Sequence, residues 1–228
     1  MAEYRVESFT PRETPIADFF SLPQRIEGLT DHQAQAEAAG TRALLDPGNT
    51  YYRTADSRSF VVRRGGAAVG RLTAFHNRLL AGEHRRFGLV GLFACENDAT
   101  AARLLVEAAS AWLGEQGLDA IRGPMAGDIW HRWRFMTRGF DTEPFAGEPR
   151  NPPHYPELIS ACGFAAARTY STKLVTDLAA AASFSQANSP TRPNRRCSPP
   201  SRRLWKAVSR PTGVPLRLTT KLRLSALR

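Results

Sequence analysis

The segment from Phe87 to Cys95 reads FGLVGLFAC and contains no charged side chain. An apolar run of this length predicts a strand that is buried on both faces. Asn97 and Asp98 follow the run, and both residue types favour the beginning of a helix. The next residues, ATAARLLVEAASAWLGEQG, carry apolar side chains at helical spacing and end at Gly117, a typical helix stop. The chain must therefore fold around a buried strand that leads into an amphipathic helix.

The flanking sequence predicts a mixed sheet. Two apolar runs surround Gly65 and Gly66, and a Gly-Gly pair between such runs is typical of a β-hairpin. A short strand over residues 119–122 completes a strand, helix, strand unit with a right-handed crossover. The remaining patterns predict strands over 4–9 and 166–176 and helices over 14–25, 30–45 and 155–162. The expected fold is α/β, with a mixed central sheet flanked by helices.

The positive charge of the chain is confined to its C-terminal part. The formal net charge is +10 over 228 residues. Residues 1–177 contain 20 Lys and Arg against 21 Asp and Glu, whereas residues 178–228 contain 11 Lys and Arg and no acid. We therefore expect one folded domain over 1–177 and a low-complexity basic tail over 178–228, either disordered or frame-shifted.

Three interpretations of the tail stay open. It is a solvated flexible segment, an arm that binds a polyanion through contacts between Arg and phosphate, or the product of a shifted reading frame. The loss of Asp and Glu over 51 residues favours the third. Nucleic-acid binding is expected only if the tail is genuine.

The cysteines and the N-terminus bear on the compartment. Cys95, Cys162 and Cys197 show no C-x-x-C spacing and cannot all pair, which indicates neither a disulfide framework nor a zinc site. The first residues carry Glu3 and Glu7 without the apolar run of a signal peptide. No window approaches the roughly 18 apolar residues of a membrane helix. We expect a cytoplasmic protein with no bound metal and no membrane association.

Residues 123–164 are dense in Gly, Pro, Trp and Arg, where an ordinary core would be aliphatic. Gly and Pro fix unusual backbone geometry, and loops that carry aromatic and charged side chains commonly hold binding and catalytic groups. This block therefore predicts a shaped site supported by the rest of the domain.

The same block carries a resemblance to a known family. The order of the predicted elements, the segment GPMAGDIWHRWR from Gly123, the following EPRNPPHYPEL and the final CGF resemble the GNAT superfamily of N-acetyltransferases. More narrowly, they resemble a poorly characterised bacterial branch with a G-P-x-x-G-x-x-W-x-x-x-R segment. The resemblance covers residues 52–177. It implies a GNAT-like fold and acyl transfer from acetyl-CoA or another acyl-CoA to an amine.

The resemblance also implies a place for the coenzyme. In GNAT enzymes the pantetheine arm pairs with the central strand like an added strand, and the pyrophosphate lies at the start of the following helix, where unpaired N–H groups and the helix dipole favour an anion. The implied coenzyme-binding residues here are Leu92, Phe93, Ala94, Asp98, Ala99, Thr100 and Ala101.

The sequence departs from the family pattern at that helix. The pyrophosphate loop usually begins with Arg or Gln and then carries Gly, but Glu96, Ala99 and Ala101 stand at those positions. Two carboxylates, those of Glu96 and Asp98, would face the pyrophosphate and repel it. Either the helix start is a working phosphate cradle, or Asn97 and Asp98 cap a structural helix.

The general acid is displaced as well. The Tyr that GNAT enzymes often place four residues before the Gly-Phe pair corresponds to Ile159. Tyr155 lies one helical turn earlier and shares that face, since residues i and i+4 are neighbours on a helix. Tyr155 is therefore the candidate acid, with hydrophobic packing of the helix as the alternative.

Within DIWHRWR, Asp128 and His131 are candidate bases, because a carboxylate and an imidazole stand three residues apart. The alternative for His131 is a hydrogen bond to a loop carbonyl. The candidate acceptor-binding residues of this motif are Trp130, Arg132, Trp133 and Arg134, with core packing as the alternative for both indoles. Asn151 contacts either the ligand or the backbone of its own turn.

These observations together predict an acyl-CoA-dependent N-acyltransferase whose acceptor is a small-molecule amine or a peptide. In the expected reaction the amine attacks the thioester directly. A non-catalytic GNAT-fold binding module with a degenerate coenzyme site is the alternative, and polyanion binding through the basic tail is a second alternative. The sequence predicts no particular acceptor or oligomeric state.

Overall fold

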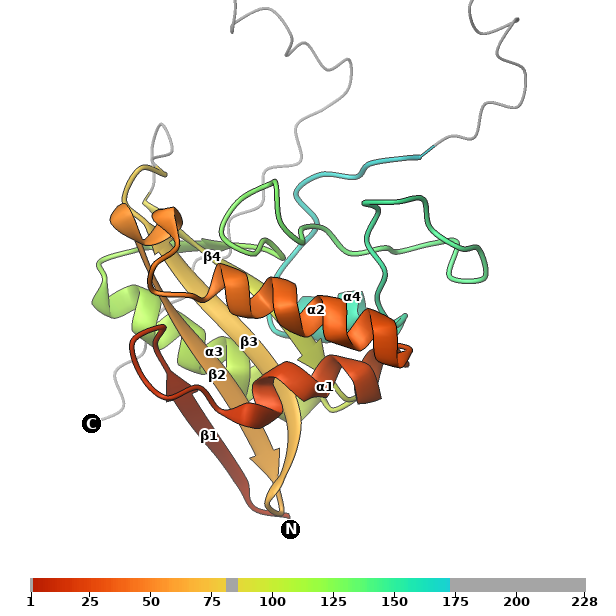
Figure 1. The fold of residues 1–228 in the computed structure, drawn as a ribbon, viewed down its shortest axis with the longest axis horizontal. Coiled ribbons are helices and arrows are strands. Elements are labelled where there is room, and N and C mark those ends of the chain that lie inside the picture. The colour runs from red at the N-terminus through yellow and green to blue at the C-terminus, as the bar shows by residue number, and fades with distance from the viewer. Residues whose placement is uncertain (1, 81–85, 173–228) are drawn as a thin grey trace, which may run out of the picture. The chain divides into compact units, whose positions relative to one another are not determined.

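The computed structural model of the chain describes residues 2–80 and 86–172. The helices and strands of these residues all lie before residue 166 and belong to one compact unit (Figure 1). Residues 166–172 belong to a second unit, of which the structure describes no other part.

A five-stranded sheet forms the centre of the first unit. Neighbouring strands are antiparallel from the first to the fourth, and the fourth and fifth are parallel. The turn between the second and third strands uses Gly65 and Gly66, at φ of 55° and 87°. The predicted hairpin and mixed sheet are therefore confirmed. In spatial order the strands are β1 (Tyr4–Phe9), β2 (Ala55–Arg64), β3 (Ala67–Asn77), β4 (Phe87–Cys95) and β5 (Ala120–Arg122).

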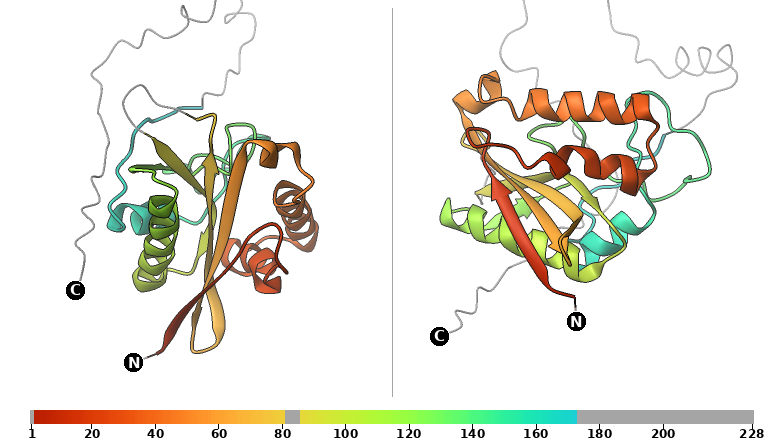
Figure 2. Two further views of the ribbon diagram at one scale, coloured as in Figure 1. Left: turned by 90° about the vertical axis from the view of Figure 1, so that its left-hand side faces the viewer. Right: turned by 60° about the horizontal axis from the view of Figure 1, so that its bottom comes forward.

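Helices cover both faces of the sheet, as predicted. Two N-terminal helices lie on one face, and two later helices lie on the other (Figure 2). These elements are α1 (Ala17–Glu27), α2 (Asp31–Leu44), α3 (Ala99–Glu115) and α4 (His154–Ala161), with a short 3₁₀ helix, η1 (Thr50–Arg53), between α2 and β2. No helix of the described residues is both long enough and apolar enough to span a membrane.

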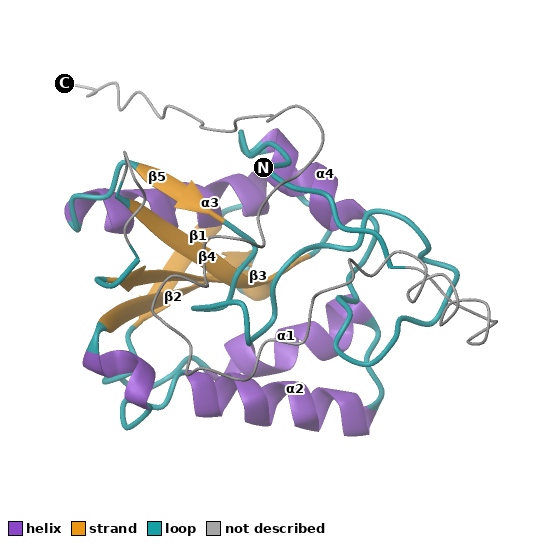
Figure 3. Cartoon of the chain, turned by 90° about the horizontal axis from the view of Figure 1, so that it is seen from above, coloured by secondary structure: helices purple, strands orange, loops and turns teal. Residues whose placement is uncertain are grey.

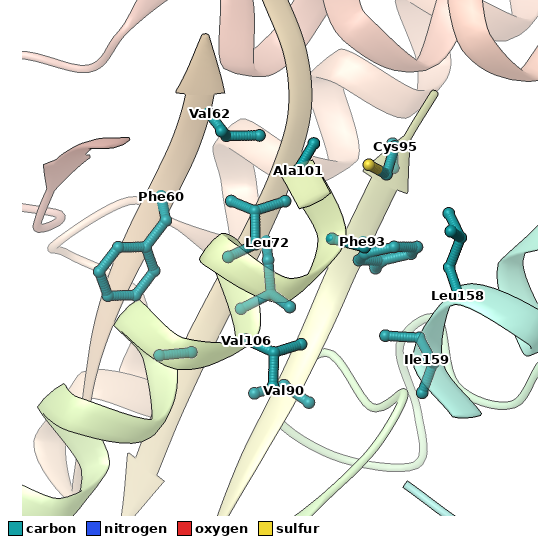
Figure 4. Packing of buried hydrophobic residues seen from close by; sticks show 14 of the residues in the cluster. Phe60, Val62, Leu72, Val90, Phe93, Cys95, Ala101, Val106, Leu158 and Ile159 are labelled. Carbon is teal, nitrogen blue, oxygen red and sulfur yellow. The ribbon is translucent and has the colours of Figure 1, made fainter. Parts of the chain in front are cut away.

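β4 is buried at every position, which confirms the prediction from its apolar sequence. On one face it packs with β2 and β3 against α3 and α4 in a single apolar cluster (Figure 4). On the other face a second cluster joins the sheet to α1 and α2. Figure 4 labels ten members of the first cluster: Phe60, Val62, Leu72, Val90, Phe93, Cys95, Ala101, Val106, Leu158 and Ile159.

Two turns fix the N-terminal helices on the sheet. Gly28 follows α1 at a φ of 64°, a left-handed conformation that ends the helix and leaves Glu27 as its last residue. Thr30 then begins α2 with a capping box, in which its hydroxyl accepts from the N–H of Gln33 and the Gln33 side chain accepts from the N–H of Thr30. α1 and α2 are therefore joined by a short, well-defined turn.

The strand predicted over residues 166–176 is wrong for its described part. Residues 166–172 form no regular secondary structure and are exposed throughout, so they bury no face that would stabilise a strand. Residues 173–176, and the basic tail predicted over 178–228, lie outside the described residues.

Candidate functional site

A cavity of about 680 Å³ lies between the α1–α2 pair, β4, α4 and residues 123–153. Residues 123–153 join β5 to α4 without a helix or strand, and we call them the irregular segment. Figure 3 shows this segment as teal loops between the α1–α2 pair and α4. The lining contains both apolar and charged side chains. Its apolar residues include Leu29, Leu44, Leu92, Phe93, Ala126 and Phe135, and its charged residues include Glu27, Glu37, Arg132, Arg134 and Glu148.

A β-bulge in β4 opens onto this cavity. The pairing of β3 with β4 shifts by one residue between Arg71 and Thr73, and Leu92 takes a left-handed φ of 51°. Leu92 and Phe93 stand outside the regular register and line the cavity, whereas Ala94 pairs with Arg71 in the ladder and does not line it. Two of the three predicted pantetheine contacts therefore lie on the cavity wall.

Gly91 of β4 allows the backbone of Met125 and Ala126 to lie close to the strand beside the bulge. A Cβ at this position would lie 2.5 Å from the carbonyl oxygen of Met125 and 2.6 Å from the backbone nitrogen of Ala126. The N–H of Met125 donates to the carbonyl of Val90 at 2.7 Å. The irregular segment therefore begins in direct backbone contact with β4, and only glycine allows that approach.

A set of polar side chains that interact with one another lies at the cavity, and we call it the Glu27 cluster: Glu27, Glu37, Arg71, Arg132 and Tyr155. All of them except Arg71 line the cavity. Arg71 of β3 is fully buried and bridges Glu37 at 2.6 Å and the carbonyl of Phe19 at 2.7 Å. Arg132 bridges Glu37 at 3.0 Å and Glu27 at 3.2 Å. Arg132 thus joins the two carboxylates, and Arg71 pairs with Glu37 alone.

The two carboxylates of the cluster differ in their electrostatic environment. Burial raises the pKa of Glu27 above its usual range, and the charges of Arg132 and Arg71 only partly oppose this. Burial also acts to raise the pKa of Glu37, but there the same two guanidinium groups outweigh it, and the pKa lies below its usual range. A pair of acids with pKa values moved apart is a common arrangement for proton transfer.

Tyr155 is one of the residues that line the cavity. Its ring packs edge to face on Phe93 with 5.0 Å between centroids, and its hydroxyl donates to Glu27 at 3.3 Å. Burial first, and then the charge of Glu27, raise the pKa of the phenol, so it keeps its proton at neutral pH. The two interpretations drawn from the sequence both apply, because the ring belongs to the core while the hydroxyl takes part in the polar cluster.

At the start of α3, backbone N–H groups are already hydrogen-bonded to the side chain of Asp98. One oxygen of Asp98 accepts from the N–H groups of Thr100 and Ala101, both at 3.0 Å. The other accepts from Tyr4 at 2.8 Å and from Arg64 at 2.6 Å. The backbone donors proposed for a pyrophosphate therefore already serve an internal carboxylate, and the cradle predicted over residues 98–101 does not fit a second anion.

The predicted repulsion at this helix is also wrong. Arg64 bridges Asp98 and Glu96, and Arg25 pairs with Glu96 on its other side. The carboxylates are neutralised within the protein, which supports the interpretation of Asp98 as a structural cap. None of Glu96, Asp98, Ala99, Thr100 and Ala101 lines the cavity.

Asp128 and His131 contact one another in an exposed turn. His131 Nδ1 lies 2.7 Å from Asp128 Oδ1, which also accepts from the backbone N–H groups of Trp130 and His131. His131 lines the cavity but Asp128 does not. The partner of this imidazole is therefore a carboxylate rather than the loop carbonyl considered from the sequence.

All of the predicted acceptor-binding residues line the cavity: Trp130, Arg132, Trp133, Arg134 and Asn151. Trp130 is 86% exposed, so the alternative of core packing is wrong for this indole. Arg134 bridges Glu148 at 3.3 Å and stacks over Trp133.

Asn151 is buried, and its side-chain amide binds the backbone of Met136 in both directions. Its amide nitrogen also donates to the carbonyl of Pro152 at 2.9 Å. The backbone role considered for Asn151 is therefore the one that the structure supports.

Sequence reasoning missed three members of the Glu27 cluster: Glu27, Glu37 and Arg71. A signal for Arg71 was present, because it stands within an apolar strand, and an arginine that is buried in a sheet requires a partner. The two glutamates gave no such signal, because acidic residues are ordinary on exposed helix faces. Among the described residues, no group of His, Cys, Asp and Glu is arranged to hold a metal ion.

No model of a known protein family matches the chain. The bacterial ceramide synthase of Caulobacter vibrioides (strain NA1000 / CB15N) is 28% identical over 166 residues, which cover 71% of this chain and 43% of that protein. Protein YghO of Escherichia coli (strain K12) is 31% identical over 111 residues, which cover 47% of this chain and 28% of that protein. A solved GCN5-related N-acetyltransferase from Ralstonia eutropha JMP134 shares 14% identity at a TM-score of 0.35, over 64% of this chain and 100% of that one. The chain thus spans less than half the length of the curated relatives it matches.

Proposed function

We propose that this chain is an acyl-CoA-dependent N-acyltransferase that joins an acyl group to an amine. The observation that carries the proposal is the cavity itself, in which the β4 bulge, an apolar wall and the Glu27 cluster converge. A relative named for making ceramide, which is an amide of a fatty acid, supports amide formation as the chemistry.

In the proposed reaction, an uncharged amine attacks the carbonyl carbon of the thioester, and the carbon–sulfur bond breaks. The acyl thioester lies against Leu92 and Phe93, at the bulge. The apolar wall excludes water, which would otherwise hydrolyse the thioester. The diphosphate of the coenzyme is not assigned to the start of α3, because Asp98 occupies the backbone donors there.

The experiment incubates the full chain with acetyl-CoA or palmitoyl-CoA and one of three amines: sphinganine, spermidine or glycine. Mass spectrometry then detects the amide product, which avoids interference of the protein's own thiols with reagents for free coenzyme. An amide that forms in proportion to enzyme concentration supports the proposal. Absence of any amide across this panel, together with no binding of either acyl-CoA by calorimetry, contradicts it.

A cavity-filling variant gives the site-specific test. Gly40 lines the cavity from within α2, and a Cβ there meets no atom within 4 Å. We expect Gly40→Leu to fold normally and to lose at least about tenfold in kcat/KM, a loss of roughly 1.4 kcal/mol of transition-state stabilisation. Gly114→Leu in α3 is the matched control, since Gly114 also has open space but does not line the cavity. Equal activity of both variants would place the chemistry elsewhere.

A non-catalytic binding module is the second candidate function. It is favoured by the start of α3, where Asp98 accepts the backbone N–H groups that would otherwise bind a diphosphate. This function expects binding of an acyl-CoA or of an acyl chain without turnover. Saturable binding of palmitoyl-CoA with no amide from any of the three amines would support the module over the enzyme.

A further inference from the structure

We infer that this protein recognises its acyl donor by the acyl group and the pantetheine arm alone, and does not bind the nucleotide half of coenzyme A. The donor class is then the acyl thioesters of pantetheine, of which acyl-CoA is one member. This inference rests on the proposed function and specifies its donor. Its starting point is that the cavity lies beside β4 but is not lined by any residue at the start of α3.

The bulge leaves part of β4 accessible from the cavity. Leu92 and Phe93 have no paired residue in β3 or in β5, and both line the cavity. Residues that a bulge leaves unpaired have backbone groups without partners in the sheet. Pantetheine contains amide groups that suit such backbone donors and acceptors, and an apolar acyl thioester suits the side chains of Leu92 and Phe93. This part of β4 therefore provides contacts for the acyl group and the arm.

The end of β4 beyond the bulge is bonded within the protein. The carbonyl of Cys95, the last residue of the strand, accepts a hydrogen bond from His154 Nε2 at 2.9 Å. His154 is the first residue of α4, and neither it nor Cys95 lines the cavity. The last carbonyl of the strand is therefore already engaged on the side of the chain that leads to α3.

At the start of α3, the groups that a diphosphate would need are bound to Asp98. Its carboxylate accepts from the N–H groups of Thr100 and Ala101, both at 3.0 Å. The guanidinium of Arg64 bridges the carboxylates of Asp98 and Glu96. A diphosphate would bind here only by displacing a group of the same sign of charge that is already in place. The helix start is therefore a poor site for the nucleotide half of the coenzyme.

The cavity offers no surplus of positive charge in its place. Among the described residues that line it, carboxylate and guanidinium groups are equal in number: Glu27, Glu37 and Glu148 against Arg132, Arg134 and Arg150. Arg132 and Arg134 pair with these glutamates. Arg150 forms no ion pair with a described residue, but a single exposed guanidinium contributes little to the binding of an anion.

The proposed reaction is complete with the shorter donor. The amine nitrogen forms a bond to the carbonyl carbon of the thioester, and the carbon–sulfur bond breaks with its electron pair on sulfur. The nitrogen loses a proton and the sulfur gains one, so the products are the amide and the free thiol of the arm. No bond of the nucleotide changes, so the nucleotide would accelerate the reaction only if the protein bound it.

The test compares two donors with the same acyl group, octanoyl-CoA and S-octanoyl-pantetheine. Each is incubated with the full chain and with sphinganine, spermidine or glycine, and mass spectrometry measures the amide. In an enzyme that binds the diphosphate, loss of its charge-assisted hydrogen bonds lowers kcat/KM by about 100-fold or more. Here we expect the values of kcat/KM for the two donors to agree within about tenfold.

Variants test whether both donors use the same cavity. We expect Gly40→Leu to lower kcat/KM for both donors by the same factor, because the new side chain fills space that the shared part of the donor occupies. Gly114→Leu, outside the cavity, is its matched control. Arg150→Ala removes the lining guanidinium that forms no ion pair with a described residue, and we expect the ratio of the two kcat/KM values to stay unchanged. A loss confined to octanoyl-CoA in Gly40→Leu or Arg150→Ala would place the nucleotide at the cavity and contradict the inference.

The outcomes separate the inference from the proposed function. If octanoyl-CoA is preferred by more than about tenfold, or if the free nucleotide half of the coenzyme competes with S-octanoyl-pantetheine, the inference is wrong although the proposed function stands. If the two donors agree and the nucleotide does not compete, the inference is supported. If S-octanoyl-pantetheine alone gives an amide, the inference holds and the proposed dependence on acyl-CoA is wrong. If neither donor gives an amide with any of the amines, both the proposed function and the inference fail.

Discussion

Asp98 has both carboxylate oxygens engaged within the protein, one with the first turn of α3 and one with Tyr4 and Arg64. Burial acts to raise the pKa of Asp98, but hydrogen bonds from Ala101, Tyr4 and Arg64 outweigh it and lower the pKa below its usual range. The stabilisation that this carboxylate gives is therefore complete above the pKa of the unfolded chain, about 3.9, and is lost as the pH falls towards the lower folded value.

We expect Asp98→Ala to lower the free energy of unfolding by roughly 1–2 kcal/mol at neutral pH, because the helix loses its cap. Asp98→Asn keeps an oxygen for the cap but no negative charge, so it should lose less at neutral pH and show a weaker dependence on acid below about pH 4. Urea denaturation over a pH series measures both effects. Identical acid dependence of Asp98→Asn and the wild type would refute the linkage.

At the scale of the element, β4 depends on the backbone contact at Gly91. A Cβ there would lie 2.5 Å from the Met125 oxygen, and the backbone cannot yield as a side chain would. We expect Gly91→Ala to destabilise the protein by about 1–3 kcal/mol, as overpacking of a close contact usually does. Gly114→Ala in α3 has open space and should stabilise by up to about 1 kcal/mol through helix propensity. Thermal unfolding of the two variants distinguishes the cases, and equal melting temperatures would contradict this account.

The elements themselves could largely be predicted from the sequence. The Gly-Gly turn, the apolar run of β4 and the helical period of α3 are local patterns, and these three predictions were confirmed within a few residues. The strand predicted over residues 166–176 was wrong for its described part. The bulge at Leu92 was not predictable, because no glycine or asparagine marks the left-handed position. The Glu27 cluster was missed for another reason: Glu27 and Arg132 are 105 residues apart, and only the packing of the fold brings them together.

At the scale of the whole molecule, the sheet separates two apolar clusters. Leu105 of α3 belongs to one, and Phe19 of α1 belongs to the other. We expect Leu105→Ala to lower the free energy of unfolding by about 2–5 kcal/mol, and Phe19→Leu by a smaller amount. Because the two residues lie in different clusters, the double variant should show the sum of both losses to within about 0.5 kcal/mol in urea denaturation. A coupling energy well above that value would mean that the sheet transmits strain between its faces.

The α1–α2 pair has a consequence for dynamics. It supplies both carboxylates of the Glu27 cluster and part of the cavity wall, and Arg71 ties it to β3 through Glu37 and the carbonyl of Phe19. Local opening of this pair would hydrate Glu27 and dismantle the cavity while leaving the sheet paired. A ligand that binds only while α1 and α2 are packed on the sheet would then hold these two helices in place. The affinity of the cavity for that ligand and the resistance of the first 45 residues to local opening would therefore measure the same equilibrium.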